Sequence, residues 1–184
     1  MNLSWIPNAI CIVRILLIVP FVAALLSGAY TTALILIVVA GLSDGLDGFL
    51  ARTFDWRTRL GSLLDPAADK LLVVSAFLTL TRLGFVPIGL AVIVVLRDIV
   101  IVSGALTYQR VAGNLEGKPT LISKLNTLFQ LIFIVLTIMY AQWGQPEAGW
   151  LTLLGATVVF TSITSGLTYV LIWSRRARAH AAAG

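Results

Sequence analysis

Six long apolar runs, separated by short polar or charged stretches, make up most of the 184-residue chain. Each run approaches the roughly 20 residues that a helix needs to cross the hydrocarbon core of a bilayer. We therefore predict six transmembrane helices: Asn8 to Leu26, Tyr30 to about Ala51, Gly61 to about Leu80, Pro87 to about Tyr108, Ser123 to about Tyr140 and Trp150 to about Trp173. With a short interfacial segment before the first helix, the expected fold is an all-α integral membrane protein in which residues 1–184 form one domain.

The composition supports the membrane class. Hydrophobic residues account for 59% of the chain and charged residues for 11%. A soluble core of this size could not bury so much apolar surface. The single cysteine, Cys11, excludes an intramolecular disulfide framework and a zinc-finger cluster. The single histidine, His180, lies in a basic C-terminal tail, residues 174–184, which we interpret as an anchor to lipid headgroups.

The basic residues outside the apolar runs gather on one predicted side of the membrane. Six crossings bring both termini to that side, which collects Arg52, Arg57, Arg59, Arg110, Lys118, Arg175, Arg176 and Arg178. The opposite loops hold only Arg82. The positive-inside rule therefore places both termini at the cytoplasmic face.

Two pairs of aspartates flank the linker between the second and third runs. Asp44 and Asp47 are three residues apart, Asp65 and Asp69 are four apart, and each spacing puts a pair on one face of a helix. Charges at membrane depth are costly and normally face a partner or a water-filled cavity. Converging carboxylates repel each other unless cations neutralise them, and their hard oxygen atoms suit Mg²⁺ or Mn²⁺. The alternative is a solvated, charged cap between two helices.

Other residues around the aspartates suit a phosphorylated ligand. Gly48 and Gly61 permit close approach of a bulky group or of two helices. Arg52 offers a planar fork of donors for phosphate oxygens, and Thr58 offers a hydroxyl group. Together these residues indicate a diphosphate site and phosphoryl transfer. The chain has no P-loop, so a nucleoside triphosphate is not indicated.

The pattern Asp44-x2-Asp47-Gly48-x2-Ala51-Arg52-x8-Gly61-x3-Asp65-x3-Asp69 resembles the full signature of the CDP-alcohol phosphotransferase family. The resemblance implies that a CDP-linked lipid donates its phosphatidyl group to an alcohol and that CMP is released. It also implies a homodimer and two divalent cations, bound by Asp44, Asp47, Asp65 and Asp69, with Asp69 also acting as the base.

The resemblance extends to residues that would hold the CDP group. Gly48, Arg52, Thr58 and Gly61 take this role by their place in the signature. Upstream, the segment from Pro7 to Arg14 resembles the start of the family's first helix, where an asparagine and a hydroxyl residue touch the nucleotide. Asn8 and Cys11 occupy these two positions, and Cys11 stands where threonine is usual.

The acceptor alcohol depends on the subfamily. Phosphatidylglycerophosphate synthases use glycerol 3-phosphate, whereas CMP-forming, eukaryotic-type cardiolipin synthases use phosphatidylglycerol. Residues 95–100 and 117–130 resemble the cardiolipin synthases, so phosphatidylglycerol is expected. Candidate acceptor ligands are Lys118, Ser123, Lys124 and Arg110, although a lysine at this level equally suits a lipid headgroup. For Arg97 and Asp98, an ion pair and a substrate contact both stay open.

Two other functions are compatible with intramembrane charge: a carrier or channel, and a scaffold that only binds metal. The two halves of the chain lack the matching Gly or Pro interruptions expected of a repeat-built carrier. CMP release from a CDP-lipid would distinguish the enzyme from both. Short loops and the absence of a transit peptide favour the bacterial cytoplasmic membrane, with the active site facing the cytoplasm.

Overall fold

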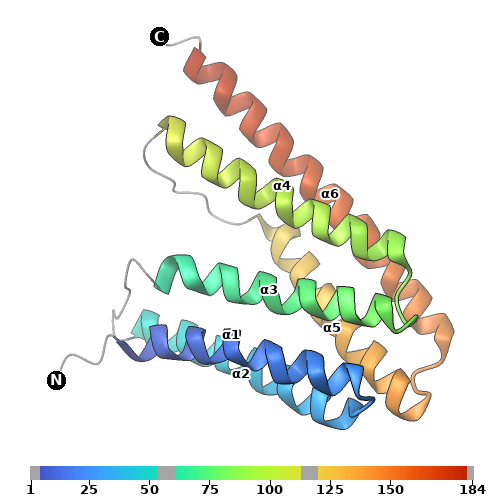
Figure 1. Cartoon of the computed structure of the whole chain (residues 1–184). Helices are drawn as coiled ribbons and strands as arrows, with labels where there is room; N and C mark the ends of the chain where they lie inside the picture. The colour runs from blue at the N-terminus through green and yellow to red at the C-terminus, as the bar shows by residue number, and fades with distance from the viewer. Residues whose placement is uncertain (1–4, 54–60, 113–119, 182–184) are drawn as a thin grey trace. The chain divides into compact units, whose positions relative to one another are not determined.

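The computed structural model describes residues 5–53, 61–112 and 120–181, and every regular element within these ranges is an α-helix. The helices are α1 (Trp5–Leu26), α2 (Tyr30–Thr53), α3 (Gly61–Arg82), α4 (Ile88–Ala112), α5 (Leu121–Trp143) and α6 (Ala148–Ala181), as Figure 1 shows. The predicted all-α fold is confirmed. Each helix overlaps one of the six predicted segments.

The C-terminal ends of α4 and α6 lie furthest beyond their apolar runs. Helix α4 continues past Tyr108 to Ala112, and α6 continues past Trp173 to Ala181. The added part of α6 is rich in alanine and arginine, which favour helix strongly. The predicted tail therefore begins as a continuation of α6. Helix α5 starts two residues early because the Thr120 hydroxyl oxygen accepts a hydrogen bond from the Ser123 amide at 3.3 Å, as an N-cap does.

Glycines with positive φ end the first and third helices. Gly28 and Gly84 have φ of 75° and 82°, a region that only glycine enters without strain. At α1 the amide of Ala29 bonds to the carbonyl of Ala24 at 2.9 Å, and that of Gly28 to Leu25 at 3.2 Å. This is the Schellman pattern, which satisfies the last carbonyls of a helix and reverses the chain. The same pattern ends α3.

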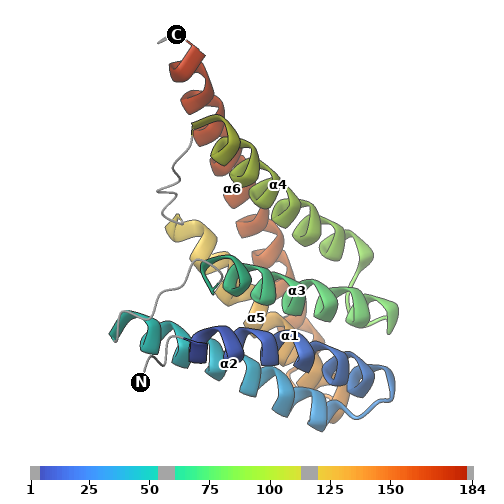
Figure 2. The same ribbon diagram turned by 60° about the vertical axis from the view of Figure 1, so that its left-hand side comes forward.

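The chain divides into two compact units. Unit 1 comprises Met1–Val86 and Ile134–Ala148, and unit 2 comprises Pro87–Phe133 and Gly149–Gly184. In unit 1, α1 packs against both α2 and α3, and Figure 2 shows these helices side by side from a second direction. Small residues at the contacts, including Ala24, Ala33 and Ala40, are buried and let the helices approach closely.

In unit 2, α6 lies close to α4 and to the first part of α5. A Cβ atom added at Gly155 would lie 3.1 Å from the Leu90 side chain and 3.3 Å from the Phe133 ring. Val94 and Val158 are fully buried in the same unit. Glycine at position 155 therefore permits the close packing of these helices.

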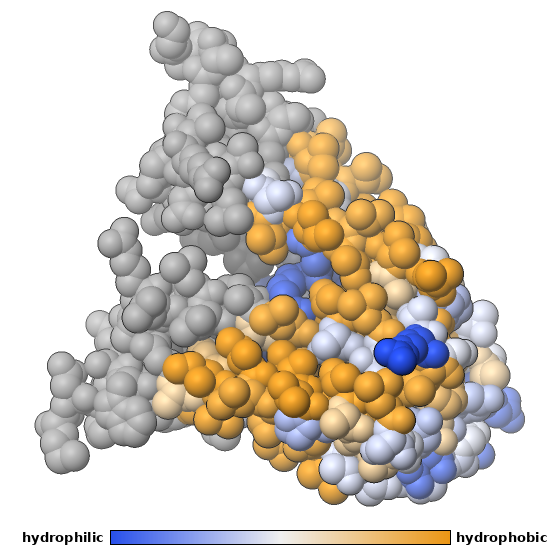
Figure 3. Space-filling view, viewed as in Figure 1, coloured by the Kyte–Doolittle hydropathy of each residue, from blue (hydrophilic) through white to orange (hydrophobic). Residues whose placement is uncertain are grey.

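Large apolar side chains remain exposed on every helix. Val19, Ile88 and Phe160 are each at least 70% exposed, and Figure 3 shows apolar side chains over much of the described surface on the face in view. Within the described residues, three helical segments are long and apolar enough to cross a membrane: Ala9–Leu26, Leu121–Trp143 and Ala148–Ile172. These segments and the exposed apolar surface identify a membrane protein.

Candidate functional site

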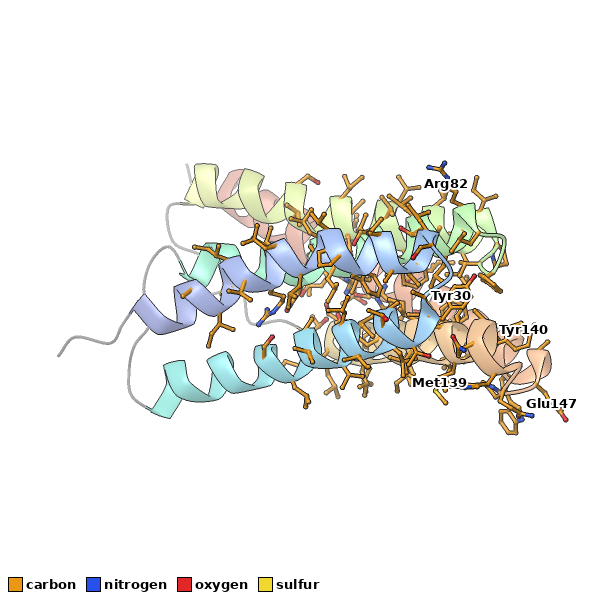
Figure 4. The ribbon with its side chains drawn as sticks, turned by 60° about the horizontal axis from the view of Figure 1, so that its bottom comes forward. Tyr30, Arg82, Met139, Tyr140 and Glu147 are labelled. Carbon is orange, nitrogen blue, oxygen red and sulfur yellow. The ribbon has the colours of Figure 1, made fainter. Side chains whose placement is uncertain are left out.

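The order of the helices brings the aspartate motif to one end of unit 1. Helix α1 leads away from that end, α2 returns to it, and α3 begins there, as Figure 1 shows. The last turns of α2 and the first turns of α3, which carry the two aspartate pairs, therefore share the end at which α1 starts. Figure 4 shows Tyr30 and Arg82 at the opposite end of the same unit.

An ion pair between Arg14 and Asp69 joins α1 to α3 at this site. Arg14 donates a hydrogen bond from Nη1 to Asp69 Oδ1 at 2.8 Å. The arginine side chain is completely buried, whereas 42% of the aspartate side chain is exposed. The bond therefore connects a fixed group inside unit 1 with a carboxylate that a ligand can reach.

The spacing of buried residues explains why these two side chains meet. On α1, Arg14, Phe21 and Leu25 are buried, and their separations of seven and four residues place them on one face. On α3, Asp69 precedes Leu72, Ala76 and Leu80, which are buried at three- and four-residue spacing. Since α1 packs against α3, Arg14 and Asp69 lie on facing sides of the two helices.

For most of the other residues predicted to bind the CDP group or a metal ion, the structure does not describe the side chain. Thr58 lies outside the described residues altogether. Of the others, the structure places the backbone within a helix but does not describe the side chain: Asn8, Asp44, Asp47, Gly48, Arg52, Gly61 and Asp65. Among the side chains that the structure describes, no three acidic, histidine or cysteine residues lie close enough together to hold a metal ion. The roles predicted for these CDP-binding and metal-binding residues therefore stay predictions.

Cys11 lies three residues before Arg14, on the same face of α1. It is 2% exposed. A buried cysteine packs as a small apolar side chain, and the contact of Cys11 with the nucleotide stays a prediction.

A second polar cluster lies in unit 2, around Arg97 of α4. Arg97 Nη1 donates to Asp98 Oδ1 at 2.6 Å, and Nη2 donates to the hydroxyl oxygens of Ser123 at 2.5 Å and Ser165 at 2.9 Å. Both charged residues are at most 5% exposed. Arg97 thus links α4 to α5 and α6. Of the two roles left open by the sequence, the structure shows the ion pair.

Helices α5 and α6 also bond directly. Asn126 Oδ1 accepts hydrogen bonds from Thr161 Oγ1 at 2.8 Å and from Ser162 Oγ at 2.9 Å. Asn126 and Ser162 are fully buried. Since these hydroxyl groups and the amide have few alternative partners in an apolar interior, the bonds fix the register of α6 on α5.

The candidate acceptor ligands separate into two groups. Ser123 faces inward and bonds to Arg97, whereas the next residue, Lys124, is exposed. Adjacent positions on a helix point in different directions, which accounts for the difference. Lys118 lies outside the described residues, and the side chain of Arg110, on α4, is not described.

Replacing Arg97 by methionine should lower the free energy of unfolding by about 3–5 kcal/mol, because it removes the positive charge beside the buried carboxylate of Asp98. The double substitution Arg97→Met/Asp98→Leu should recover most of that loss, since it removes both charges. Denaturant unfolding in detergent micelles measures both effects. A single variant as stable as the native protein would show that the pair does not hold unit 2 together.

Arg14 is the residue of this site to which the sequence alone assigned no role. The sequence did contain a feature that points to Arg14, because it is the only charged residue in the first apolar run. A buried charge implies a partner, but the sequence did not indicate which aspartate. The contact between α1 and α3 identifies Asp69.

Comparison with known proteins places this site in context. The model of the CDP-alcohol phosphatidyltransferase family matches residues 4–173. A CMP-forming cardiolipin synthase of Rattus norvegicus is 30% identical over 181 residues, which span 89% of this chain and 60% of the rat protein. This chain thus corresponds to less than two thirds of that relative's length.

Two further relatives differ in name. The chloroplastic CDP-diacylglycerol–glycerol-3-phosphate 3-phosphatidyltransferase 1 of Oryza sativa is 33% identical over 159 residues, covering 76% of this chain and 48% of the rice protein. A CDP-diacylglycerol–glycerol-3-phosphate 3-phosphatidyltransferase of Bacillus subtilis is 30% identical over 132 residues, covering 61% of this chain and 68% of the bacterial protein. With a family match over almost the whole chain, this protein belongs to the CDP-alcohol phosphatidyltransferase family.

Proposed function

We propose that this protein transfers the phosphatidyl group of CDP-diacylglycerol to phosphatidylglycerol, which yields cardiolipin and CMP. The observation that carries the proposal is the similarity to the rat cardiolipin synthase across 89% of the chain, combined with the family match. The resemblance of residues 95–100 and 117–130 to cardiolipin synthases supports the same acceptor.

The reaction is a substitution at phosphorus. A hydroxyl oxygen of phosphatidylglycerol forms a bond to the β-phosphorus of the donor, the diphosphate P–O bond breaks, and CMP leaves. The hydroxyl proton passes to the carboxylate of Asp69. Asp69 suits this task because its side chain is accessible and its orientation is fixed by Arg14.

Divalent cations fit the residues of this site. Asp69 is a partly exposed carboxylate at the motif end of unit 1, and carboxylate oxygens are preferred ligands of Mg²⁺ and Mn²⁺. Asp44, Asp47, Asp65 and Asp69 would hold two such ions. Bound cations would neutralise charge that develops on the diphosphate.

The remaining predicted residues complete the proposal. Arg52, Gly48, Thr58, Gly61, Asn8 and Cys11 would bind the CDP group. Lys118, Lys124 and Arg110 would attract the acceptor's phosphate, and the exposure of Lys124 supports this role. Ser123 would contribute to the acceptor site indirectly, through the hydrogen bond that it accepts from Arg97.

We extend the proposal to the arrangement in the membrane. Three helical segments of membrane length support a protein that crosses the membrane several times, and the six apolar runs of the sequence lead us to propose six crossings. The distribution of basic residues supports cytoplasmic termini and a cytoplasmic active site. The bacterial cytoplasmic membrane, a homodimer and a single catalytic domain belong to the same proposal. The family match spans parts of both units, which supports one domain.

Phosphatidylglycerophosphate synthase is the second candidate function. The rice and Bacillus relatives, which are named for glycerol 3-phosphate, favour it. Glycerol 3-phosphate is a small dianion that arrives from water, so its binding would require several basic residues near the active site. Phosphatidylglycerol carries one phosphodiester charge and arrives within the membrane. The three bases of the acceptor set suit either charge, so the acceptor must be decided by assay.

Offered both acceptors with labelled CDP-diacylglycerol, the purified protein in lipid nanodiscs should form cardiolipin. Lys124→Ala should raise KM for phosphatidylglycerol, because it removes a cation from the acceptor's path. Thin-layer separation of labelled lipids and CMP release measure the two quantities. Arg82→Ala, which removes a base at the opposite end of unit 1, is the matched control.

If labelled phosphatidylglycerophosphate is the only product, the acceptor is glycerol 3-phosphate and not phosphatidylglycerol. No CMP release with any alcohol, from a correctly folded protein, would overturn the enzymatic proposal as a whole. It would favour a carrier or a metal-binding scaffold instead.

A further inference from the structure

Arg14 is the best-buried charged residue that the structure describes, and the chemistry proposed above does not require it as a ligand. It lies on α1, outside the aspartate signature. Its side chain is completely buried, so it is not offered to a substrate. Its Nη1 atom donates a 2.8 Å hydrogen bond to Asp69 Oδ1.

Burial makes this arginine a rigid partner. A guanidinium group held among packed side chains cannot adopt many orientations, and its planar fork directs its N–H groups. Asp69, in contrast, has a partly exposed side chain, and an exposed aspartate can adopt several rotamers. Because α1 is packed against α3, the ion pair restrains the orientation of the accessible Asp69 carboxylate.

We propose that Arg14 is a positioning residue for Asp69, which it holds in the orientation that proton transfer from the acceptor hydroxyl requires. The inference rests on the proposed function, in which Asp69 is the base. Arg14 does not touch the reacting atoms. It acts through the hydrogen bond from Nη1 to Oδ1.

A base must lie within hydrogen-bond distance of the proton it takes, and small displacements are costly. A misplacement of about 1 Å can lower a rate about 100-fold. Loss of the Arg14 bond releases Asp69 from its orientation but leaves the carboxylate on α3. The expected defect is therefore in kcat, and not in the binding of CDP-diacylglycerol.

Arg14→Gln should lower kcat about 100-fold, while KM for CDP-diacylglycerol stays within about twofold of the native value. Arg14→Lys keeps the charge but loses the planar fork, so it should retain more activity than Arg14→Gln. Arg82→Gln is the matched control on α3. It removes an exposed arginine about 20 Å along the helix from Asp69 and should leave kcat unchanged.

A double-substitution cycle distinguishes positioning from a general loss of stability. If Arg14 acts through Asp69, adding Arg14→Gln to Asp69→Asn should lower kcat no further. A purely structural role would lower kcat by the same factor in both backgrounds. The same four proteins are to be unfolded in detergent micelles, where the ion pair should appear as coupling between the two substitutions.

The possible results of these experiments test the positioning role, the ion pair and the proposed function separately. Undiminished kcat in Arg14→Gln, or equal losses in both backgrounds, would overturn the positioning role. Unfolding free energies that simply add would overturn the ion pair itself. A native protein that releases no CMP with either acceptor, although the unfolding cycle shows coupling, would overturn the proposed function and leave the ion pair standing.

Discussion

Asp69→Asn is expected to lower turnover by about 10²- to 10⁴-fold, the usual contribution of a general base. Asparagine has nearly the same shape, and its amide oxygen can accept the hydrogen bond from Arg14 that Asp69 Oδ1 accepts. It cannot take up the acceptor's proton. The variant should therefore keep much of its affinity for CDP-diacylglycerol while it loses kcat. Calorimetric binding of the donor and CMP release under saturating donor measure the two effects separately.

Substitutions at the other three motif aspartates provide the comparison. Asp44→Asn, Asp47→Asn and Asp65→Asn should each weaken metal-dependent donor binding, because each removes a charged oxygen ligand. If all four variants lose donor affinity equally, Asp69 is first a metal ligand and the base lies elsewhere. The positioning role proposed for Arg14 would then fall with the base assignment.

Removal of divalent cations should abolish turnover. Without counter-charge, four carboxylates repel both one another and the donor's diphosphate. Excess chelator should stop CMP release, and Mg²⁺ or Mn²⁺ added beyond the chelator should restore it. Ca²⁺ should restore it poorly, since it is larger and takes looser coordination. Mn²⁺ binding followed by electron paramagnetic resonance gives a readout that does not depend on activity.

A control for the chelator is its metal-saturated form, which should leave turnover unchanged. Full activity in excess free chelator would contradict the two-cation proposal. Arg52 and the neighbouring bases would then have to neutralise the diphosphate by themselves.

The sequence by itself determined the class of fold and the family. The apolar runs predicted the helices because a membrane-length helix needs a continuous run of apolar residues, which is a local property. Boundaries differed where local capping or propensity extended a helix, as at Thr120 and after Trp173. The aspartate spacing identified the family because the signature is itself a sequence pattern.

Only the tertiary structure decided which polar side chains of different helices are partners. Arg14 and Asp69 are 55 residues apart in the chain, and Arg97 and Ser165 are 68 apart. Periodicity shows that such residues face inward but not which side chain of another helix they meet, because that depends on which helices pack together and at what height. The contact of α1 with α3 makes Arg14 the partner of Asp69, and the packing of α4, α5 and α6 joins Arg97 to Ser123 and Ser165.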